Sequence, residues 1–182
     1  MNVFTDEEVE HLSRFVGYGA PNADYWFLGM EEGGGGEENL RARLNFKEIE
    51  DCSKAHEKLG ITKFHFGKRT IQRTWRGMCY LMLLIEGVSS SRENIRAYQA
   101  EKLGSENGNT LLCELMPLPK QSIENWDYDK IMPQFKSRDH YYSTVKESRI
   151  SLLRNLYLRE KPKCIVAYGK GLWGSYKRIF PR

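Results

Sequence analysis

Apolar positions recur at helical spacing in several parts of the chain. Thr5 and Glu8 have the spacing of a capping box, and apolar residues at positions 9, 12 and 16 predict a first helix directly after it. The regular spacing from Ile71 to Ile85 predicts the strongest helix, which ends at Gly87. Further helices are predicted at 40–59 (one helix, or two broken near 45), 91–104, 139–156 and 172–180, with Ser91 and Asp139 as N-caps.

Three short apolar runs between turn signals predict strands. The run Y-W-F-L at 25–28 is apolar throughout, as in a strand that is buried on both faces. The run T-L-L-C-E-L at 110–115 is expected to end at Pro117 and Pro119, because proline cannot donate a ladder hydrogen bond. A third run, C-I-V-A-Y, occupies 164–168. Since strands alternate with helices, we predict a three-layer α/β/α domain with a central parallel sheet.

Length, charge and cysteine usage add little beyond a general class. The 182 residues predict one domain over 1–182, and a net charge of +4 is too small to identify a partner. The four cysteines lie far apart in the sequence, at Cys52, Cys79, Cys113 and Cys164. The last three sit in apolar runs, which indicates core thiols in a reduced, cytoplasmic protein. No apolar run approaches 18 residues and the N-terminus is acidic, so we expect neither a membrane partner nor a signal peptide.

The segment after the first strand combines acidic residues with glycines. Glu31 and Glu32 precede four glycines at 33–36, and Glu37 and Glu38 follow them. Open α/β sheets place ligands at such polar loops, and glycines allow close approach of a substrate. The alternative is that the carboxylates only keep the loop solvated, and that Glu37 and Glu38 begin the next helix. A nucleoside triphosphate site is not expected, because no G-K-[ST] follows and the carboxylates would repel phosphates.

The stretch 61–76 is basic and aromatic, with no acidic residue. Its basic members are Lys63, Lys68, Arg69, Arg73 and Arg76, and its aromatic members include Phe64, Phe66 and Trp75. Basic and aromatic side chains together suit a nucleic acid, so DNA is the expected partner, with Lys68, Arg69 and Arg73 on the phosphates. A solvated face, with Trp75 in the core, is the alternative. The sequence does not define an oligomeric state.

Aromatic residues after the second strand and the histidines are two further groups that could bind a ligand. Trp126 and Tyr128 follow the second strand and either line a pocket above it or anchor their loop by burial. The four histidines, His11, His56, His65 and His140, show no metal-ligand spacing. We therefore expect no metal and no cofactor.

Three pieces of the sequence, taken in order, resemble the uracil-DNA glycosylase superfamily. They are F-L-G-M-E-E-G at 27–33, L-L-C-E-L-M-P-L-P at 111–119 and K-P-K-C-I-V-A-Y-G-K at 161–170. The resemblance spans the chain from about 24 to 180. It implies a central parallel sheet and hydrolysis of the N-glycosidic bond of a base that is flipped out of DNA.

The resemblance also assigns roles to individual residues. Glu31 falls where the superfamily has its water-activating acidic residue, and Gly33 falls where the loop closes against the flipped base. Glu114 replaces the asparagine that reads the pyrimidine edge, which removes the side-chain N–H donors. We take Glu32, Gly34 and Trp126 as further base-binding candidates. The superfamily's histidine loop has no counterpart here, so either the native chain continues beyond Arg182 or that half of the site is missing.

We therefore expect a DNA-base glycosylase-like protein in which Glu31 activates water. Glu31 and Glu114 should emerge from the tips of adjacent strands, over one shared hollow. The alternatives are a non-catalytic nucleic-acid or nucleotide-binding module of the same fold, and a protein-interaction domain.

Overall fold

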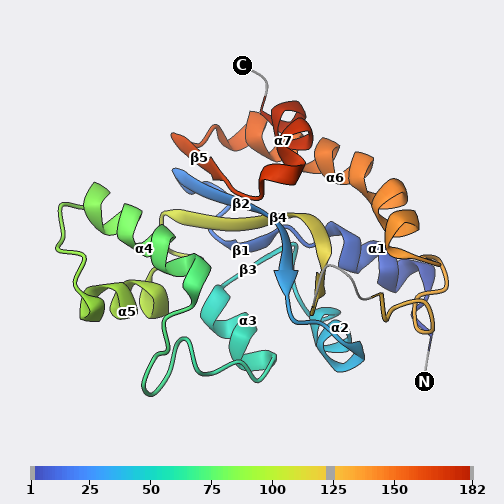
Figure 1. The fold of residues 1–182 in the computed structure, drawn as a ribbon, viewed down its shortest axis with the longest axis horizontal. Coiled ribbons are helices and arrows are strands. Elements are labelled where there is room, and N and C mark those ends of the chain that lie inside the picture. The colour runs from blue at the N-terminus through green and yellow to red at the C-terminus, as the bar shows by residue number, and fades with distance from the viewer. Residues whose placement is uncertain (1–2, 122–125, 181–182) are drawn as a thin grey trace.

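The computed structural model describes residues 3–121 and 126–180, and in these residues a mixed sheet of five strands lies at the centre (Figure 1). The strand order is β3-β1-β4-β2-β5. The strands are β1 (Gly17–Gly19), β2 (Tyr25–Gly33), β3 (Ile49–Glu50), β4 (Thr110–Lys120) and β5 (Cys164–Ala167). The three predicted strands are confirmed as β2, β4 and β5, and β2 pairs in parallel with both of the others. The sheet is not entirely parallel, because the short β1, which was not predicted, runs antiparallel to β4.

Helices cover both faces of this sheet, as in a three-layer α/β/α arrangement (Figure 1). One face packs against α1 (Asp6–Arg14), α6 (Arg138–Glu160) and α7 (Trp173–Ile179), and the other against α3 (Cys52–Lys58), α4 (Arg73–Ile85) and α5 (Arg92–Glu101). The helix α2 (Glu37–Arg43) follows the end of β2, and a short 3₁₀ turn, η1 (Lys170–Leu172), precedes α7. Trp26 and Leu28 enter one core and Phe27 enters the other, so β2 is buried on both faces as predicted.

Most helix ends follow the predicted capping residues. Thr5 forms the complete capping box of α1, and Ser91 caps α5. The helix α6 differs from the prediction, because its N-cap is Ser137, whose side chain accepts the N–H of His140. Asp139 lies inside the first turn instead, where its charge favours the positive end of the helix. Of the two alternatives for 40–59, the structure has two helices, α2 and α3, separated by β3.

The strands β2 and β4 are both longer than predicted. The prediction that Pro117 and Pro119 end the second strand is wrong, because β4 continues to Lys120. The pairing of β2 with β4 shifts register between Glu31↔Met116 and Gly33↔Lys120, so the prolines lie in an irregular segment that needs no regular ladder donors. As a consequence, Glu31 and the residue after it belong to β2 rather than to a loop.

Three of the four cysteines are buried, and Cys164 is exposed. The prediction of a core thiol is therefore wrong for Cys164. It is the first residue of β5, which forms an edge of the sheet and has a neighbouring strand on one side only.

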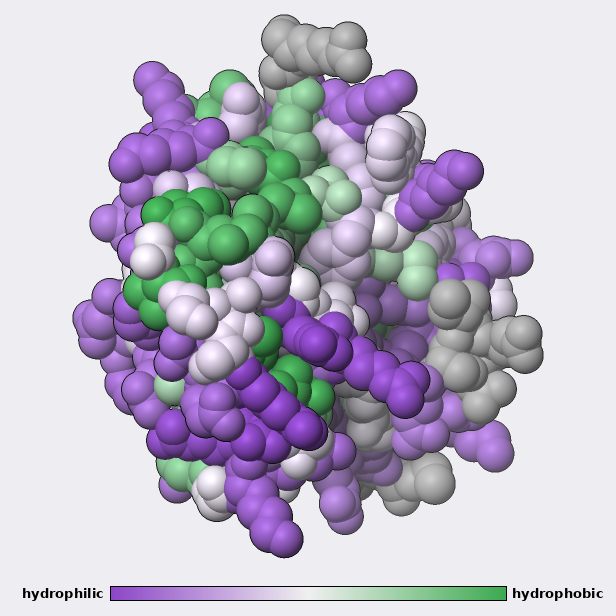
Figure 2. Space-filling model, turned by 60° about the vertical axis from the view of Figure 1, so that its left-hand side comes forward, coloured by the Kyte–Doolittle hydropathy of each residue, from purple (hydrophilic) through white to green (hydrophobic). Residues whose placement is uncertain are grey.

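The side of the molecule that carries α4 has a mixed surface. Figure 2, which brings this side forward, shows a hydrophobic area bordered by hydrophilic side chains. The exposed hydrophobic residues of this region are Tyr80, Leu84, Ile85 and Val88. Within the described parts of the chain, no helix has both the length and the apolar character needed to cross a bilayer.

Candidate functional site

The candidate site lies at the carboxyl ends of three parallel strands. Gly29 of β2 pairs with Glu114 of β4, and β5 pairs with β2 on its other side. A cavity of about 40 Å³ opens here, and its lining includes Tyr18, Glu32, Trp75, Glu114 and Tyr168. That volume holds roughly one or two water molecules. The cavity has the position that open α/β sheets use for ligands.

Glu114 is partly buried and forms part of the wall of this cavity. Its Oε1 accepts a hydrogen bond of 3.0 Å from the hydroxyl of Tyr168, and its Oε2 has no hydrogen-bond partner among the described residues. Burial raises the pKa of Glu114 to about 8, and the negative charges of Glu32 and Glu31 act in the same direction. Glu114 is therefore mostly protonated at neutral pH, and it offers both an O–H donor and an acceptor.

Gly29 leaves the space that the Glu114 side chain occupies. A Cβ built on Gly29 would lie 2.1 Å from Oε2 of Glu114 and 2.5 Å from the hydroxyl oxygen of Tyr168. The Glu114 carboxyl and the Tyr168 phenol can therefore meet over β2 only because position 29 has no side chain.

Gly29→Ala is expected to destabilise the protein by about 1–3 kcal/mol, because the new methyl group must displace both side chains. Urea denaturation measures the change. The matched control is Gly77→Ala in α4, where a Cβ meets nothing within 4 Å and where alanine should stabilise the helix by up to about 1 kcal/mol. Equal stability of wild type and Gly29→Ala would contradict the close packing at this point.

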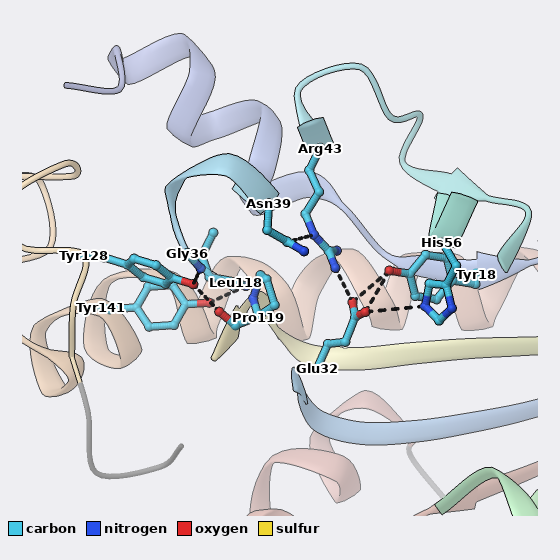
Figure 3. Close-up of polar contacts among 10 residues, drawn as sticks. All are labelled: Tyr18, Glu32, Gly36, Asn39, Arg43, His56, Leu118, Pro119, Tyr128 and Tyr141. Carbon is cyan, nitrogen blue, oxygen red and sulfur yellow. Dashed lines mark hydrogen bonds and ion pairs between the residues drawn. The ribbon is translucent and has the colours of Figure 1, made fainter. Parts of the chain in front are cut away.

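Glu32 is the centre of a polar network on the same side of the sheet (Figure 3). Both of its carboxylate oxygens lie 2.9 Å from the hydroxyl of Tyr18, and Nη2 of Arg43 donates to Oε2 at 2.8 Å. Nε2 of His56 lies 4.0 Å from Oε1. The Arg43 side chain is only 2% exposed, and Asn39 accepts from its Nε. A buried guanidinium thus holds the Glu32 carboxylate in one orientation.

Burial alone would lower the pKa of Arg43, but the charge of Glu32 and the hydrogen bond between the two groups raise it above its usual value. The guanidinium consequently keeps its positive charge. Burial, with smaller contributions from the neighbouring His65 and from the Arg43 charge, lowers the pKa of His56 to about 3, so this ring is neutral at pH 7.

Glu31 points away from the Glu32 network. Its Oε2 accepts from the hydroxyl of Tyr142 at 2.9 Å, and its Oε1 lies 3.9 Å from Nη2 of Arg138, both on α6. Successive strand residues project to opposite sides, so Glu31 and Glu32 cannot both line one cavity. The tips of β2 and β4 are adjacent as expected, but the residue that shares the hollow with Glu114 is Glu32.

The glycines after Glu32 differ in what surrounds them. A Cβ at Gly33 or Gly34 would meet nothing within 4 Å, whereas a Cβ at Gly35 would lie 2.3 Å from the hydroxyl oxygen of Tyr128. Gly34 lines a separate hollow of about 300 Å³, together with Lys120 and Tyr128. Packing within the protein thus requires a glycine at position 35, whereas Gly33 and Gly34, which were predicted to bind substrate, border open space.

Trp126 anchors its own loop. Its ring stacks on Tyr141 with centroids 5.2 Å apart, and its Nε1 donates to the carbonyl of Phe135 at 2.8 Å. Trp126 is not among the residues that line the Glu114 cavity. Of the two interpretations made from the sequence, loop anchoring describes its contacts.

The predicted phosphate-binding residues do not form one group. Lys68 is exposed, and Nη1 of Arg69 donates to Glu101. Arg73 instead lies with Arg76 and Arg92 around a hollow of about 450 Å³, between the starts of α4 and α5. Sequence spacing did not identify Arg92, because it lies 16 residues beyond Arg76 and reaches this hollow only through the packing of α5 on α4.

The structure also brings Cys52, His56 and His65 together, with potential ligand atoms that all lie within 4.8 Å of one another. One signal for this group is visible in the sequence, since Cys52 and His56 are four residues apart and lie on one face of a helix. His65 could not be added, because it follows α3 in an irregular segment. No family model matches the chain, and comparisons with curated proteins and with solved structures found no significant match either.

Proposed function

We propose that this chain is a DNA-base glycosylase-like hydrolase in which Glu114 acts as the acid and Glu32 as the carboxylate. The observation that carries the proposal is the contrast between two glutamates that line one cavity. Burial keeps Glu114 protonated, and Arg43 holds Glu32 as its ion-pair partner. Two carboxyl groups in unlike environments are the arrangement that glycosidic-bond hydrolysis uses.

In the proposed reaction the C–N bond between sugar and base breaks, and its electron pair leaves with the base. The O–H of Glu114 hydrogen-bonds or protonates the departing base, and the Glu32 carboxylate lies beside the positive charge that develops on the sugar. Water then bonds to the sugar carbon and loses a proton to a carboxylate. Glu31, which the resemblance places in the water-activating role, faces α6 and does not line this cavity, so Glu32 is the carboxylate that we propose for this last step.

A protonated glutamic acid also suits the position that an asparagine occupies in the superfamily. Like an amide, it offers one donor and one acceptor to the edge of a base. The unpartnered Oε2 of Glu114 is the atom that is free to make this contact within the described structure.

Entry of a base requires the cavity to open. A volume of about 40 Å³ is too small for a nucleobase, and the ring of Trp75 from the start of α4 forms part of the lining. Arg73 and Arg76 flank this tryptophan in the sequence and, with Arg92, line the neighbouring hollow. These three arginines are the groups that we expect to contact DNA phosphates while Trp75 is displaced by, or stacks on, the base.

A second candidate function is a non-catalytic nucleic-acid-binding module. Two observations favour it. The cavity is closed, and the Glu32 carboxylate already contacts Tyr18, Arg43 and His56, which leaves it less available to a substrate. In this case the arginines would bind nucleic acid and the glutamates would only maintain the fold.

The experiment incubates the full chain with DNA oligonucleotides that carry uracil, hypoxanthine, oxidised or alkylated bases, and then cleaves abasic sites with alkali. We expect base release from at least one substrate, with a loss of about 10²- to 10⁴-fold in Glu114→Gln. Glu38→Gln, at the solvated start of α2, is the matched control and should keep full activity.

The same oligonucleotides separate the two functions. If no base is released from any substrate, the enzymatic proposal fails. DNA binding that weakens with salt, survives Glu114→Gln and is lost in Arg73→Glu/Arg76→Glu would then identify a binding module. Absence of both release and binding at low salt would contradict both candidates.

A further inference from the structure

A compact group of one thiol and two imidazoles lies behind the Glu32 network. Cys52 is the first residue of α3, His56 follows one turn later, and His65 comes from the segment after this helix. All three are buried, with 1–3% of their surfaces exposed. The Sγ of Cys52 lies 3.9 Å from Nε2 of His65, and this nitrogen lies 3.0 Å from Nδ1 of His56.

The ring nitrogens that point out of the group each face an oxygen. Nδ1 of His65 lies 3.4 Å from the carbonyl oxygen of Ala100, and Nε2 of His56 lies 4.0 Å from a carboxylate oxygen of Glu32. Histidines that bind a metal through one nitrogen usually direct the other N–H toward a carbonyl or carboxylate, which fixes the ring. His65 has such a partner in Ala100, and the Glu32 carboxylate is a charged neighbour of His56 beyond hydrogen-bond distance.

The two rings approach each other through one nitrogen each. Nδ1 of His65 lies within hydrogen-bond distance of the Ala100 carbonyl, which is an acceptor, so the hydrogen of this neutral ring is on Nδ1. Nε2 of His65 is then left with a lone pair, and it lies 3.0 Å from Nδ1 of His56 and 3.9 Å from Sγ of Cys52. A cation bound at this point could accept a lone pair from each of the three ligand atoms.

We propose that Cys52, His56 and His65 bind a zinc ion, with a water molecule as the fourth ligand. Thiolate and imidazole are the ligands that zinc prefers in proteins. Tetrahedral zinc with the usual bond lengths separates two nitrogen ligands by about 3.3 Å and a nitrogen from a sulfur by about 3.6 Å. The observed 3.0 and 3.9 Å differ from these values by only a few tenths of an ångström, and all the ligand atoms of the group lie within 4.8 Å of one another, so Cys52 and His56 would move closer together on binding. Binding converts the thiol to a thiolate and releases its proton to solvent.

Zinc at this position would also fix the wall of the cavity. The His56 ring stacks on Trp75 with centroids 5.4 Å apart and an angle of 15° between the planes. Nε2 of the same ring lies 4.0 Å from a carboxylate oxygen of Glu32. An ion that holds His56 therefore restrains both the tryptophan that lines the cavity and the carboxylate inside it, although zinc binding does not require the chain to be an enzyme.

The test uses the purified full chain after removal of metal with a chelator, and it contains no DNA, so its outcome is independent of the proposed hydrolase activity. Addition of Zn²⁺ should saturate at one ion per chain in competition with a chromophoric chelator and should raise the melting temperature. Addition of Co²⁺ should give the visible absorption of a tetrahedral site and a thiolate-to-cobalt charge-transfer band.

Matched variants identify the ligands. Cys52→Ser should abolish the charge-transfer band, and His65→Ala should weaken zinc binding at least 10-fold. Cys79→Ser, at a buried thiol of α4, and His140→Ala, on α6, should bind like wild type. Circular dichroism checks that each variant is folded. Three results would each contradict the zinc site: binding of less than one ion per chain, a wild-type cobalt spectrum without the charge-transfer band, or unchanged binding in folded Cys52→Ser. The wild-type spectrum tests the site even if a variant does not fold.

Discussion

The wild-type protein should lose much more stability than Glu114→Gln as pH rises from 5 to 9. The pKa of Glu114 is about 8 in the folded protein, against about 4.3 in an unfolded chain. Between these values the folded state binds the additional proton, so the contribution of Glu114 to stability is greatest below pH 4 and decreases until pH exceeds 8. At about 1.36 kcal/mol per pKa unit, the loss is on the order of 5 kcal/mol. Glutamine stays neutral throughout.

The measurement is urea denaturation of both proteins at pH 5, 7 and 9. The groups that act on the ionisation of Glu114 are Tyr168, directly after β5, the charges of Glu32 and Glu31 on β2, and Arg149 on α6, whose guanidinium donates to the Glu114 carbonyl. All of them remain in the variant, so the difference between the two proteins isolates position 114. Glu38→Gln serves as the control and should follow wild type. A difference that does not change with pH would show that Glu114 is ionised, and the acid role proposed for it would fail.

Local signals in the sequence predicted most of the helices and the three main strands. The caps at Thr5 and Ser91 and the regular spacing from 71 to 85 depend on residues within one or two turns, and the structure confirms them. The run 25–28 also needed no distant information, because four successive apolar residues can only be accommodated in a strand with a core on each side. The parallel direction of these three strands followed from their alternation with helices, whereas their order is seen only in the structure.

The features that could not be predicted depend on pairing between distant segments. The strands β1 and β3 contain three and two residues, too few for a pattern, and they exist because β4 and its neighbours pair with them. The register shift near Pro117 and Pro119 decides which glutamate of β2 enters the cavity, and a change of one residue reverses that choice. For the same reason the sequence could suggest Glu114 but not its pairing with Glu32.

The residues around the site were also missed where they come from separate elements. Arg92 joins Arg73 only through the packing of two helices, and His65 reaches Cys52 only because the chain folds back after α3. The resemblance to the glycosylase superfamily located the two strand tips, but it placed the carboxylate of the cavity at position 31 rather than at 32. The sequence thus predicted that the site lies at the carboxyl ends of these strands, but only the structure shows which side chains line the cavity.

The other large effect is expected at Arg43. Arg43→Met should destabilise the protein by about 3 kcal/mol or more, because removal of one member of a buried ion pair leaves an uncompensated charge. The Glu32 side chain is 21% exposed, which places the expected value near the lower end of the usual range of about 3–5 kcal/mol. The matched control is Arg178→Met, whose partner Glu147 is exposed on the surface, so that its loss should change stability far less than the loss of Arg43. Urea denaturation at pH 7 measures both.

A double-mutant cycle separates the ion pair from the packing of the arginine side chain. In Arg43→Met/Glu32→Gln no charge remains to be compensated, so the double variant should be more stable than Arg43→Met alone. The hydrogen bonds of Tyr18 to position 32 can persist in both proteins, since glutamine retains an acceptor oxygen. If the two substitutions are simply additive, Arg43 does not hold Glu32 in its charged form. The contrast between the two glutamates of the cavity, on which the proposed chemistry depends, would then be lost.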